Sequence, residues 1–232
     1  MTNRRDLLLI GAGLAGVAAA WQMWIGRPQP LAFTELEDLP GWRMLEGGQV
    51  SAPGGADFLT LGQGTDRIEP LPRADLPAVL YGETDPSTLA VFSDFFCPYC
   101  RVLTARLAAR PDLSVTWHEL PLLGPASEVA ARALIAADLQ GAYAPFTAAL
   151  LQRGFRPSRA HMAQVADSIG LDGARLATDM GGPQVATRLM ASRRAAAALG
   201  VYGTPGLTVG RTLVIGEIDM ADLDRLVALE AT

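Results

Sequence analysis

The sequence of 232 residues predicts an α/β fold, and three observations lead to that prediction. An apolar run at residues 89–92 passes almost directly into a pattern of helical period at residues 101–110. A long alanine-rich block of helical period follows, placed at about residues 125–200. Two short apolar runs and a last helical segment come after it. The predicted order is therefore strand, helix, strand, helices, hairpin and helix.

The first predicted elements surround the apolar run. Residues 78–82 and 89–93 have the composition of strands, and residues 83–86 have the composition of the turn between them. Residues 101–110 predict a helix that ends before a proline, and residues 113–120 predict another strand. The strand at 89–93 delivers the residues after it to a strand end, where open α/β sheets bind their ligands.

The rest of the chain predicts mostly helices. Alanine-rich segments of helical period lie at residues 127–140, 143–151, 158–169, 171–180 and 183–199. Beyond them, two apolar runs separated by Gly210 and Arg211 predict a hairpin. Asp219 is expected to cap a final helix that extends to Leu229.

Residues 1–25 are typical of an export signal or a membrane anchor. Arg4 and Arg5 directly precede an apolar run that extends to about Ile25, and this arrangement resembles a twin-arginine export signal. Small residues at 18–20 suit a cleavage site, whereas the continuation to Ile25 lengthens the run toward membrane-spanning size. Two forms stay open, one exported to the periplasm and one anchored in the inner membrane and facing the periplasm.

Residues 26–75 form a predicted linker or N-terminal extension that is rich in proline and glycine. Apolar pieces at residues 31–33 and around Trp42 carry enough apolar surface to dock on the rest of the chain. Trp42 is interpreted as a packing anchor rather than as part of a substrate surface, and residues 58–61 predict a short strand. The domain that carries the chemistry is predicted to comprise residues 76–232.

The two cysteines of the chain, Cys97 and Cys100, are separated by two residues and predict a redox-active dithiol. In the first turn of a helix, this spacing brings the sulfurs within bonding distance. Cys97 lies at the expected helix N-terminus, where free N–H groups and the helix dipole stabilise a thiolate, so it is the predicted nucleophile with a lowered pKa. Pro98 suits the first helical position and Tyr99 can tune the thiolate. Cys100 is the predicted resolving thiol.

Other uses of the cysteine pair fit the sequence less well. Arg101 follows the pair, which excludes a haem-attachment site because that site needs histidine there. A zinc site would need His118 and His161, whose spacing is not that of a zinc finger, and no metal is assigned. A purely structural disulfide in so short a loop would stabilise little. The net charge of -5 gives no indication of a nucleic-acid partner.

Two motifs of this chain resemble the DsbA-like branch of the thioredoxin superfamily. They are Phe92-Ser93-Asp94-Phe95-Phe96-Cys97-Pro98-Tyr99-Cys100 and, far downstream, Gly200-Val201-Tyr202-Gly203-Thr204-Pro205. The resemblance extends from about Leu76 to the C-terminus. It implies a thioredoxin-like fold whose helical insertion caps the redox site. It also implies dithiol–disulfide exchange at Cys97 and Cys100 with no cofactor, since the disulfide itself carries the electrons.

The resemblance implies further that the bond between Thr204 and Pro205 is cis and lies beside the sulfurs, where the backbone pairs with an extended substrate. Thr204 resembles the threonine of the isomerase branch rather than the valine of the best-known oxidase. That oxidase has a buried glutamate where this chain has Val91, so proton handling is expected to differ. Asp94 is interpreted either as a general base for Cys100 or as a helix-capping acid.

The remaining side chains near the motif receive structural interpretations. Phe95, Phe96 and Tyr99 are expected to pack around the dithiol or to present an apolar rim to clients. His118 and Glu119 end the neighbouring strand, where they could face the site, and they are interpreted as solvated or hydrogen-bonded structural residues.

These observations predict an exported thiol:disulfide oxidoreductase that forms or shuffles disulfides in envelope proteins. Its predicted partners are unfolded or thiol-containing envelope proteins and a membrane redox protein that recycles the dithiol. Three alternatives stay open. They are a periplasmic disulfide reductase, serving for example cytochrome maturation, a copper-handling dithiol protein, and a chaperone that binds clients without redox chemistry.

Overall fold

The computed structural model describes most of the chain. The described residues are 30–52, 68–82 and 88–231. The expected export signal or anchor, the expected strand at 58–61 and the expected turn at 83–86 lie outside them. Phe33–Thr232 form one compact unit. Within the described ranges, no helix is long and apolar enough to cross a membrane.

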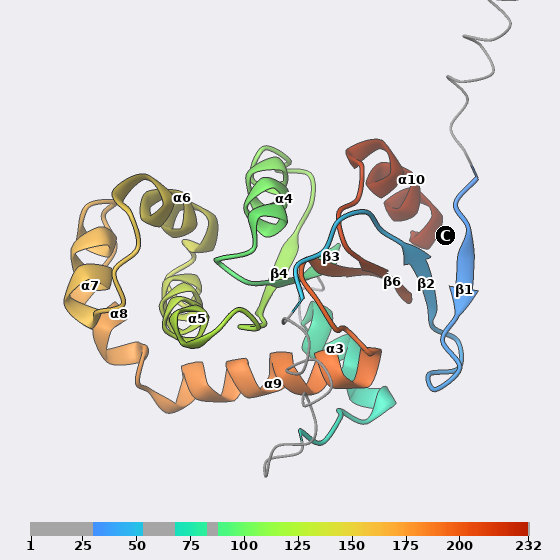
Figure 1. The fold of residues 1–232 in the computed structure, drawn as a ribbon, viewed down its shortest axis with the longest axis horizontal. Coiled ribbons are helices and arrows are strands. Elements are labelled where there is room, and N and C mark those ends of the chain that lie inside the picture. The colour runs from blue at the N-terminus through green and yellow to red at the C-terminus, as the bar shows by residue number, and fades with distance from the viewer. Residues whose placement is uncertain (1–29, 53–67, 83–87, 232) are drawn as a thin grey trace, which may run out of the picture. The chain divides into compact units, whose positions relative to one another are not determined.

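One mixed sheet organises this unit (Figure 1). In sheet order, its strands are β1 (Phe33–Glu35), β2 (Arg43–Glu46), β6 (Thr212–Ile215), β5 (Gly206–Val209), β3 (Leu89–Ser93) and β4 (Val115–Glu119). The pairs β2–β6 and β3–β4 are parallel, and the other neighbours are antiparallel. A parallel pair needs a crossover connection, which the helix Pro98–Ala108 supplies between β3 and β4.

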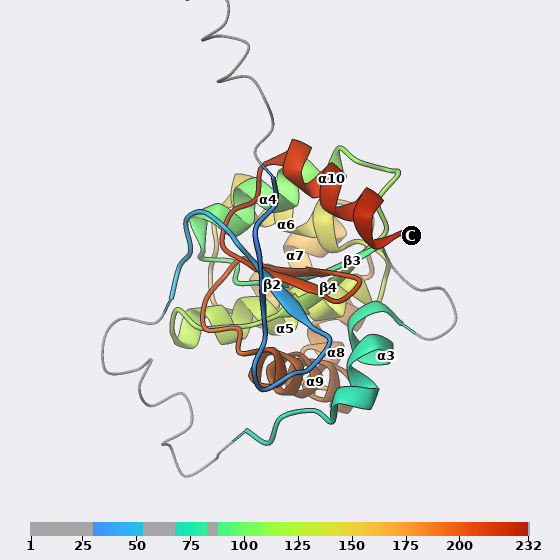
Figure 2. The same ribbon diagram turned by 90° about the vertical axis from the view of Figure 1, so that its right-hand side faces the viewer.

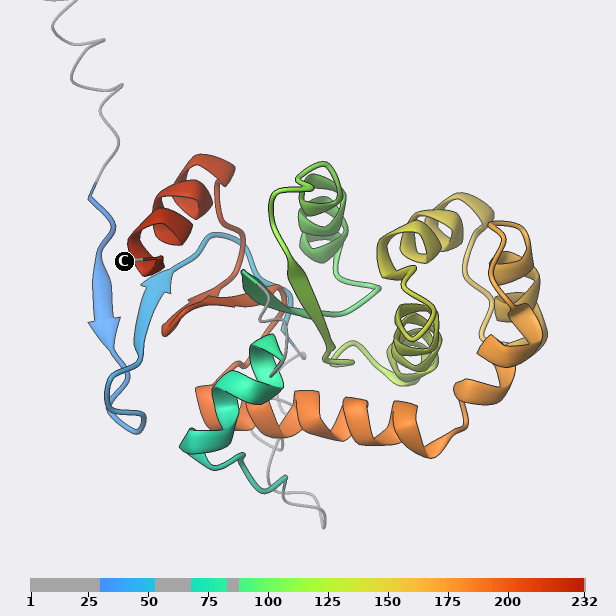
Figure 3. The same cartoon turned by 180° about the vertical axis from the view of Figure 1, so that it is seen from behind.

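Helices cover both faces of the sheet (Figure 3). Helices α4 (Pro98–Ala108) and α10 (Met220–Glu230) lie on one face. On the other face lie α3 (Leu76–Tyr81), preceded by the short 3-10 helix Arg73–Asp75, and α9 (Pro183–Leu199). Every residue of β3 is buried, because this strand lies inside the sheet with helices on both sides. A strand in that place reads as a continuous apolar run rather than as an alternation.

Helix α3 shows that the strand predicted at residues 78–82 is wrong. Pro77 occupies the first helical turn, and Gly82 follows the helix with a φ of 84°. Leu76 and Leu80 are four residues apart and both fully buried. That spacing places them on one helical face. Composition alone does not separate a short buried helix from a strand, and tertiary packing decided between the two.

Part of the predicted N-terminal extension belongs to the sheet, because residues 33–46 supply β1 and β2 (Figure 2). The side chain of Trp42 is 2% exposed and lies in the main hydrophobic cluster, so the prediction of a packing anchor is confirmed. Arg43 donates to the Thr212 hydroxyl at 2.8 Å and pairs with the Glu230 carboxylate at 2.6 Å. These contacts fix the extension to β6 and α10.

The predicted helical insertion is confirmed, with helix ends shifted by a few residues. It comprises α5 (Pro125–Asp138), α6 (Tyr143–Arg153), α7 (Arg159–Asp167), α8 (Gly173–Asp179) and α9. Ser158 caps α7 and Asp172 caps α8, each by accepting a backbone N–H bond in the first turn. The hairpin turned by Gly210 and the α10 cap at Asp219 are also as predicted.

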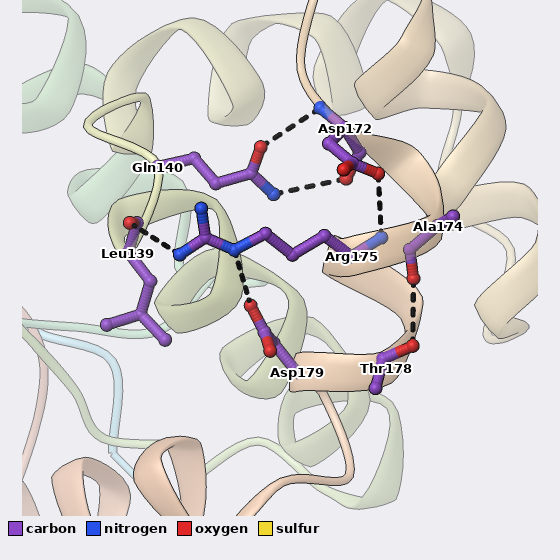
Figure 4. A network of polar contacts seen from close by, with 7 residues as sticks. All are labelled: Leu139, Gln140, Asp172, Ala174, Arg175, Thr178 and Asp179. Atoms are coloured by element: carbon purple, nitrogen blue, oxygen red, sulfur yellow. Dashed lines mark hydrogen bonds and ion pairs between the residues drawn. The ribbon is translucent and has the colours of Figure 1, made fainter.

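A polar network holds α8 against the end of α5 (Figure 4). Gln140, just after α5, donates to the backbone oxygen of Asp172 at 3.1 Å and accepts from its N–H at 3.0 Å. The amide therefore pairs with that backbone as a neighbouring strand would. Within α8, Arg175 pairs with Asp179 at 3.3 Å, and Arg175 also donates to the carbonyl oxygen of Leu139, just after α5, at 3.5 Å. Helix α8 is thus tied to the end of α5.

Candidate active site

Cys97 forms the N-cap of α4. Its backbone is extended, with φ -72° and ψ 117°, and Pro98 follows as the first helical residue. The Cys97 sulfur accepts a hydrogen bond from the backbone N–H of Cys100 at 3.2 Å. The sulfur therefore takes the place that a serine or aspartate oxygen takes in an ordinary N-cap. Both cysteines are free thiols and both are buried.

The two sulfurs titrate in opposite directions. A hydrogen bond from the Cys100 thiol is the main cause that lowers the pKa of Cys97 to about 5, and the Ser51 hydroxyl and the Cys100 N–H add to it against the effect of burial. Burial, followed by the adjacent Cys97, raises the pKa of Cys100 far above its usual value. At neutral pH the pair is thus a thiolate at Cys97 and a thiol at Cys100. Dithiol exchange requires this division between nucleophile and resolving group.

The loop before β5 lies directly against Cys97. The Thr204–Pro205 peptide bond is cis, as the resemblance implies. The Cys97 sulfur lies 3.2 Å from the carbonyl oxygen of Thr204, and it donates a hydrogen bond to that oxygen only when it is protonated. The Thr204 hydroxyl is buried and makes no hydrogen bond within the described part of the chain. It lies close enough to both sulfurs to favour their thiolate forms, and it adds a small lowering effect to the pKa of Cys97 and of Cys100. The cis-proline loop and the dithiol form one site.

Asp94 is buried, and the donors around its carboxylate come from neighbouring loops. One oxygen accepts from the N–H of Phe96 at 2.8 Å and from the Ser127 hydroxyl at 2.9 Å. The other accepts from the two N–H groups of residues 122–123, at 2.8 and 3.1 Å. The helix-capping interpretation is wrong for α4, because Cys97 is its N-cap. Asp94 joins the loop before α4 to the start of α5, and its role as a base stays a prediction.

Glu119, at the end of β4, forms a buried acid pair with a tyrosine of the insertion. The Tyr143 hydroxyl donates to one Glu119 oxygen at 2.5 Å, and the other oxygen has no partner among the described residues. Burial raises the pKa of Glu119 to about 8, so the carboxyl is protonated at neutral pH. Burial, followed by the adjacent Glu119, raises the pKa of Tyr143 well above its usual value, and a charge on the Cys100 sulfur would add a smaller effect in the same direction. The pair therefore connects the insertion to the dithiol side of the sheet.

His118 points to the opposite face of β4. Its ring nitrogens lie 3.2 Å from the Ser192 hydroxyl and 3.3 Å from the carbonyl oxygen of Leu80. Burial lowers the pKa of His118 to about 4, so the ring is neutral. The structural interpretation of His118 is confirmed. Across the described ranges, no group of three or more His, Cys, Asp or Glu side chains is arranged to hold a metal ion.

An aromatic cluster borders the motif. Phe95 and Phe96 are in edge contact at 5.2 Å between ring centroids, and Phe155 contacts them at 5.5 and 5.0 Å. Arg101 donates to the carbonyl oxygen of Phe95 at 2.8 Å and covers its ring. Phe95 is buried, whereas Phe96 and Tyr99 are half-buried. Phe155 lies in the loop between α6 and α7, and sequence reasoning missed it because a lone aromatic in a loop carries no positional signal.

Ser51, from the N-terminal extension, is a second neighbour of the dithiol that sequence reasoning missed. Its N–H donates to the carbonyl oxygen of Thr204 at 2.7 Å, and the Thr204 N–H donates to the Ser51 carbonyl oxygen at 2.8 Å. The two residues form an isolated antiparallel bridge. No motif marks Ser51 in the sequence, because the bridge depends on a backbone pairing between residues 153 positions apart.

The family model for the DSBA-like thioredoxin domain matches residues 88–228. This range begins just before β3, ends within α10 and contains the dithiol and the cis-proline loop. The chain belongs to this family. DsbA-like proteins are thiol:disulfide oxidoreductases, and the predicted thioredoxin-like fold with its helical insertion is confirmed.

Several solved structures resemble this chain over most of their own length. A thioredoxin-like oxidoreductase from Silicibacter pomeroyi DSS-3 has 30% sequence identity and a TM-score of 0.58, covering 66% of this chain and 96% of that one. The thiol-disulfide exchange protein alpha-DsbA2 from Wolbachia pipientis has 22% identity and a TM-score of 0.57, covering 75% and 95%. The catalytic domain of ScsC from Proteus mirabilis has 22% identity and a TM-score of 0.54, covering 68% and 95%. At 22% identity, the last two show the fold alone.

One curated protein also matches the DsbA-like chain. The Na(+)/H(+) antiporter NhaA from Herminiimonas arsenicoxydans is 33% identical over 158 residues, which is 60% of this chain. The chain spans only about a quarter, 25%, of that protein's length.

Proposed function

We propose that this protein is an exported thiol:disulfide oxidoreductase that forms or shuffles disulfides in envelope proteins. The observation that carries the proposal is the Cys97–Cys100 pair at the start of α4 beside the cis-proline loop, an arrangement that lowers the pKa of Cys97 and raises that of Cys100. A stabilised Cys97 thiolate favours the reduced form of the pair, because the reduced state gains the free energy of that charge. A dithiol with a stabilised reduced form passes its disulfide on to other thiols.

Oxidation of a client proceeds in two exchange steps. A client thiolate attacks the Cys97 sulfur of the oxidised pair, and the bond to Cys100 breaks as that sulfur takes up a proton. A second client thiolate attacks the client sulfur of the mixed disulfide and releases Cys97 as a thiolate. Counted from its two thiols, the client loses two electrons and two protons; the pair gains both electrons, Cys100 takes one proton and the other proton passes to the solvent. The low pKa of Cys97 makes it a good leaving group in the second step.

The same residues support shuffling when the pair is reduced. The Cys97 thiolate attacks a client disulfide, and Cys100 resolves the mixed disulfide if the client fails to rearrange. The proposed clients are unfolded or thiol-containing envelope proteins, and a membrane redox protein is proposed to recycle the pair. The twin arginines at Arg4 and Arg5 support export to the periplasm.

The equilibrium reduction potential of the Cys97–Cys100 pair tests the proposal. The purified protein is equilibrated with mixtures of reduced and oxidised glutathione, and trapped thiols are counted by mass. We expect a potential between roughly -120 and -180 mV, the range of strong oxidants and isomerases. A value near roughly -270 mV, as in thioredoxin, would overturn the oxidant and support the periplasmic reductase. A Cys100→Ser variant is the control that cannot close the pair.

A further inference from the structure

Residues 47–52 lie across the cis-proline loop, and we call this segment the strap. Its backbone is held at two places. Gly48 donates to the carbonyl oxygen of Glu217 at 2.6 Å, and Glu217 donates back to Gln49 at 2.9 Å. Farther along, Ser51 and Thr204 exchange the two hydrogen bonds of their bridge. The strap lies outside residues 88–228, the range that the family model matches.

The surface under the strap is shaped to receive it. At Gly203 a Cβ atom would lie 2.5 Å from a methyl group of Val50 and 2.9 Å from the Ser51 carbonyl oxygen. At Gly216, whose φ is 102°, a Cβ atom would lie 2.5 Å from the oxygen of Gly48. Both positions need glycine because the strap backbone approaches so closely. The contact is therefore a specific fit over two loops.

The strap uses both polar groups of the Thr204 backbone. An extended peptide binds at a free sheet edge through the same kind of N–H and C=O pair. One residue cannot form both hydrogen bonds with two strands at once. Cys97 beside this edge is 0% exposed with the strap in place, so an incoming client sulfur cannot reach it until a covering segment moves.

The side chains of the strap alternate as in a β-strand. Val50 and Ala52 face Gly203, whereas the Ser51 hydroxyl lies against the Cys97 sulfur and lowers its pKa. Serine has the shape of cysteine with oxygen in place of sulfur, and it cannot form a disulfide. Ser51 therefore stands at the position of a client cysteine without the ability to react.

We propose that the strap is an intramolecular pseudosubstrate. It occupies the edge of Thr204 that an extended cysteine-containing peptide would use, with Ser51 in the place of the reacting cysteine, and it must leave before a protein client binds. The inference rests on the proposed thiol:disulfide exchange. It adds that clients compete with a segment of the same chain, which favours extended, unfolded polypeptides over folded surfaces.

A cysteine at position 51 tests the alignment directly. The test uses full-length protein in which Ser51→Cys is combined with Cys100→Ser. Oxidised glutathione accepts two electrons from Cys97 and the new thiol, so that these two sulfurs form a disulfide and two molecules of reduced glutathione are released. The matched control is Ala52→Cys in the same background, because Ala52 faces Gly203. We expect the position 51 variant to close its disulfide at a glutathione ratio at least tenfold more reducing than the control needs. Equal ratios, or a position 51 thiol that stays free, would overturn the alignment.

A second variant tests displacement. Ser51→Pro removes the N–H that bonds to the Thr204 oxygen, which weakens the strap, and it also removes the hydroxyl that stabilises the thiolate. Loss of the hydroxyl alone would slow Cys97. We expect instead that iodoacetamide alkylates Cys97 at least tenfold faster than in the wild type, with a similar gain in oxidation of a reduced two-cysteine peptide. Unchanged or slower alkylation and oxidation rates would overturn the proposal that the strap blocks Cys97.

Failure of the proposed function would look different. If the wild-type protein exchanges no disulfide with glutathione, the proposed thiol:disulfide oxidoreductase activity is contradicted. Suppose that the wild type exchanges disulfides with glutathione normally, but the Ser51→Cys and Ala52→Cys variants close their disulfides at the same glutathione ratio. This result would contradict only the pseudosubstrate proposal.

Discussion

The Cys97 thiolate and the Glu119 carboxyl show how two buried acids in one site acquire opposite charge states. Cys97 receives hydrogen bonds from Cys100 and from a helix N-terminus, which stabilise negative charge. Glu119 receives one hydrogen bond from Tyr143, and its second oxygen has no partner in the described part of the chain. Burial without enough donors keeps that carboxyl neutral. The number of donors, rather than burial alone, separates the two groups.

The neutral state of Glu119 predicts a loss of stability with rising pH. From its ordinary pKa of 4.5 up to about 8, the unfolded chain has released this proton while the folded chain keeps it. The free energy of unfolding therefore falls as pH rises through that window. We expect Glu119→Gln to flatten this slope, because the amide can still accept from Tyr143 and does not titrate. Urea unfolding at a series of pH values between 4.5 and 8 measures this slope. The oxidised proteins are used because the two cysteines do not titrate once they form a disulfide.

The control for this prediction is Glu37→Gln, which changes an exposed carboxylate. Its unfolding profile should run parallel to that of the wild type. A Glu119→Gln profile that is also parallel would show that the Glu119 carboxyl is ionised in the folded protein.

At the scale of elements, β2 joins the N-terminal extension to the C-terminal part of the sheet. Trp42, just before this strand, fills the main hydrophobic cluster together with Leu213 of β6. Glu230 of α10 collects hydrogen bonds from Arg43, the Thr212 hydroxyl and the Arg211 N–H. The strap begins directly after β2, so this docking also sets where residues 47–52 lie.

Truncation of Trp42 tests that docking. A large aromatic in a core leaves a cavity when it is replaced by alanine, and such changes cost about 3–5 kcal/mol. We expect Trp42→Ala to lose stability in that range in urea unfolding. Leu151→Ala is the control, because Leu151 is 41% exposed and its loss should change stability by only about 0.5 kcal/mol. Equal effects of the two substitutions would mean that Trp42 does not dock in solution.

At the scale of the whole molecule, the oxidation state of the dithiol is coupled to folding. In the reduced protein the pKa of Cys97 falls from its ordinary 9.0 to about 5 on folding. Between these values the folded chain has released the proton and the unfolded chain keeps it. The reduced form therefore gains stability as pH rises from about 5 to 9, and loses it as pH falls through 5. The oxidised form has no thiol that titrates.

We expect the reduced protein to melt above the oxidised protein at pH 8, and the gap between the two to shrink toward pH 5. The gap should correspond to a few kcal/mol at most, since each pKa unit is worth about 1.4 kcal/mol. Thermal unfolding of both forms across this range measures it. Reduced Cys97→Ser should lose the dependence. Reduced and oxidised wild-type curves that stay parallel with pH would contradict the thiolate assignment.

The local features of the site follow from the sequence by itself. Local sequence decides which sulfur meets the free N–H groups of the helix N-terminus. The features that decide it are the spacing of Cys97 and Cys100, the proline between them and the expected helix start, and all of these lie within one helical turn. The same holds for the hairpin at Gly210 and the cap at Asp219. Short-range geometry and residue type suffice for such features, and the family motifs added the cis bond before Pro205.

Contacts between residues far apart in the chain were decided only by tertiary structure. Composition suits residues 78–82 to a strand as well as to a helix, and burial of Leu76 and Leu80 on one face selected the helix. The bridge of Ser51 to Thr204 and the bond of Tyr143 to Glu119 join segments that carry no shared pattern. Long-range pairing depends on which surfaces the packed elements leave adjacent, and no local preference of the chain encodes that.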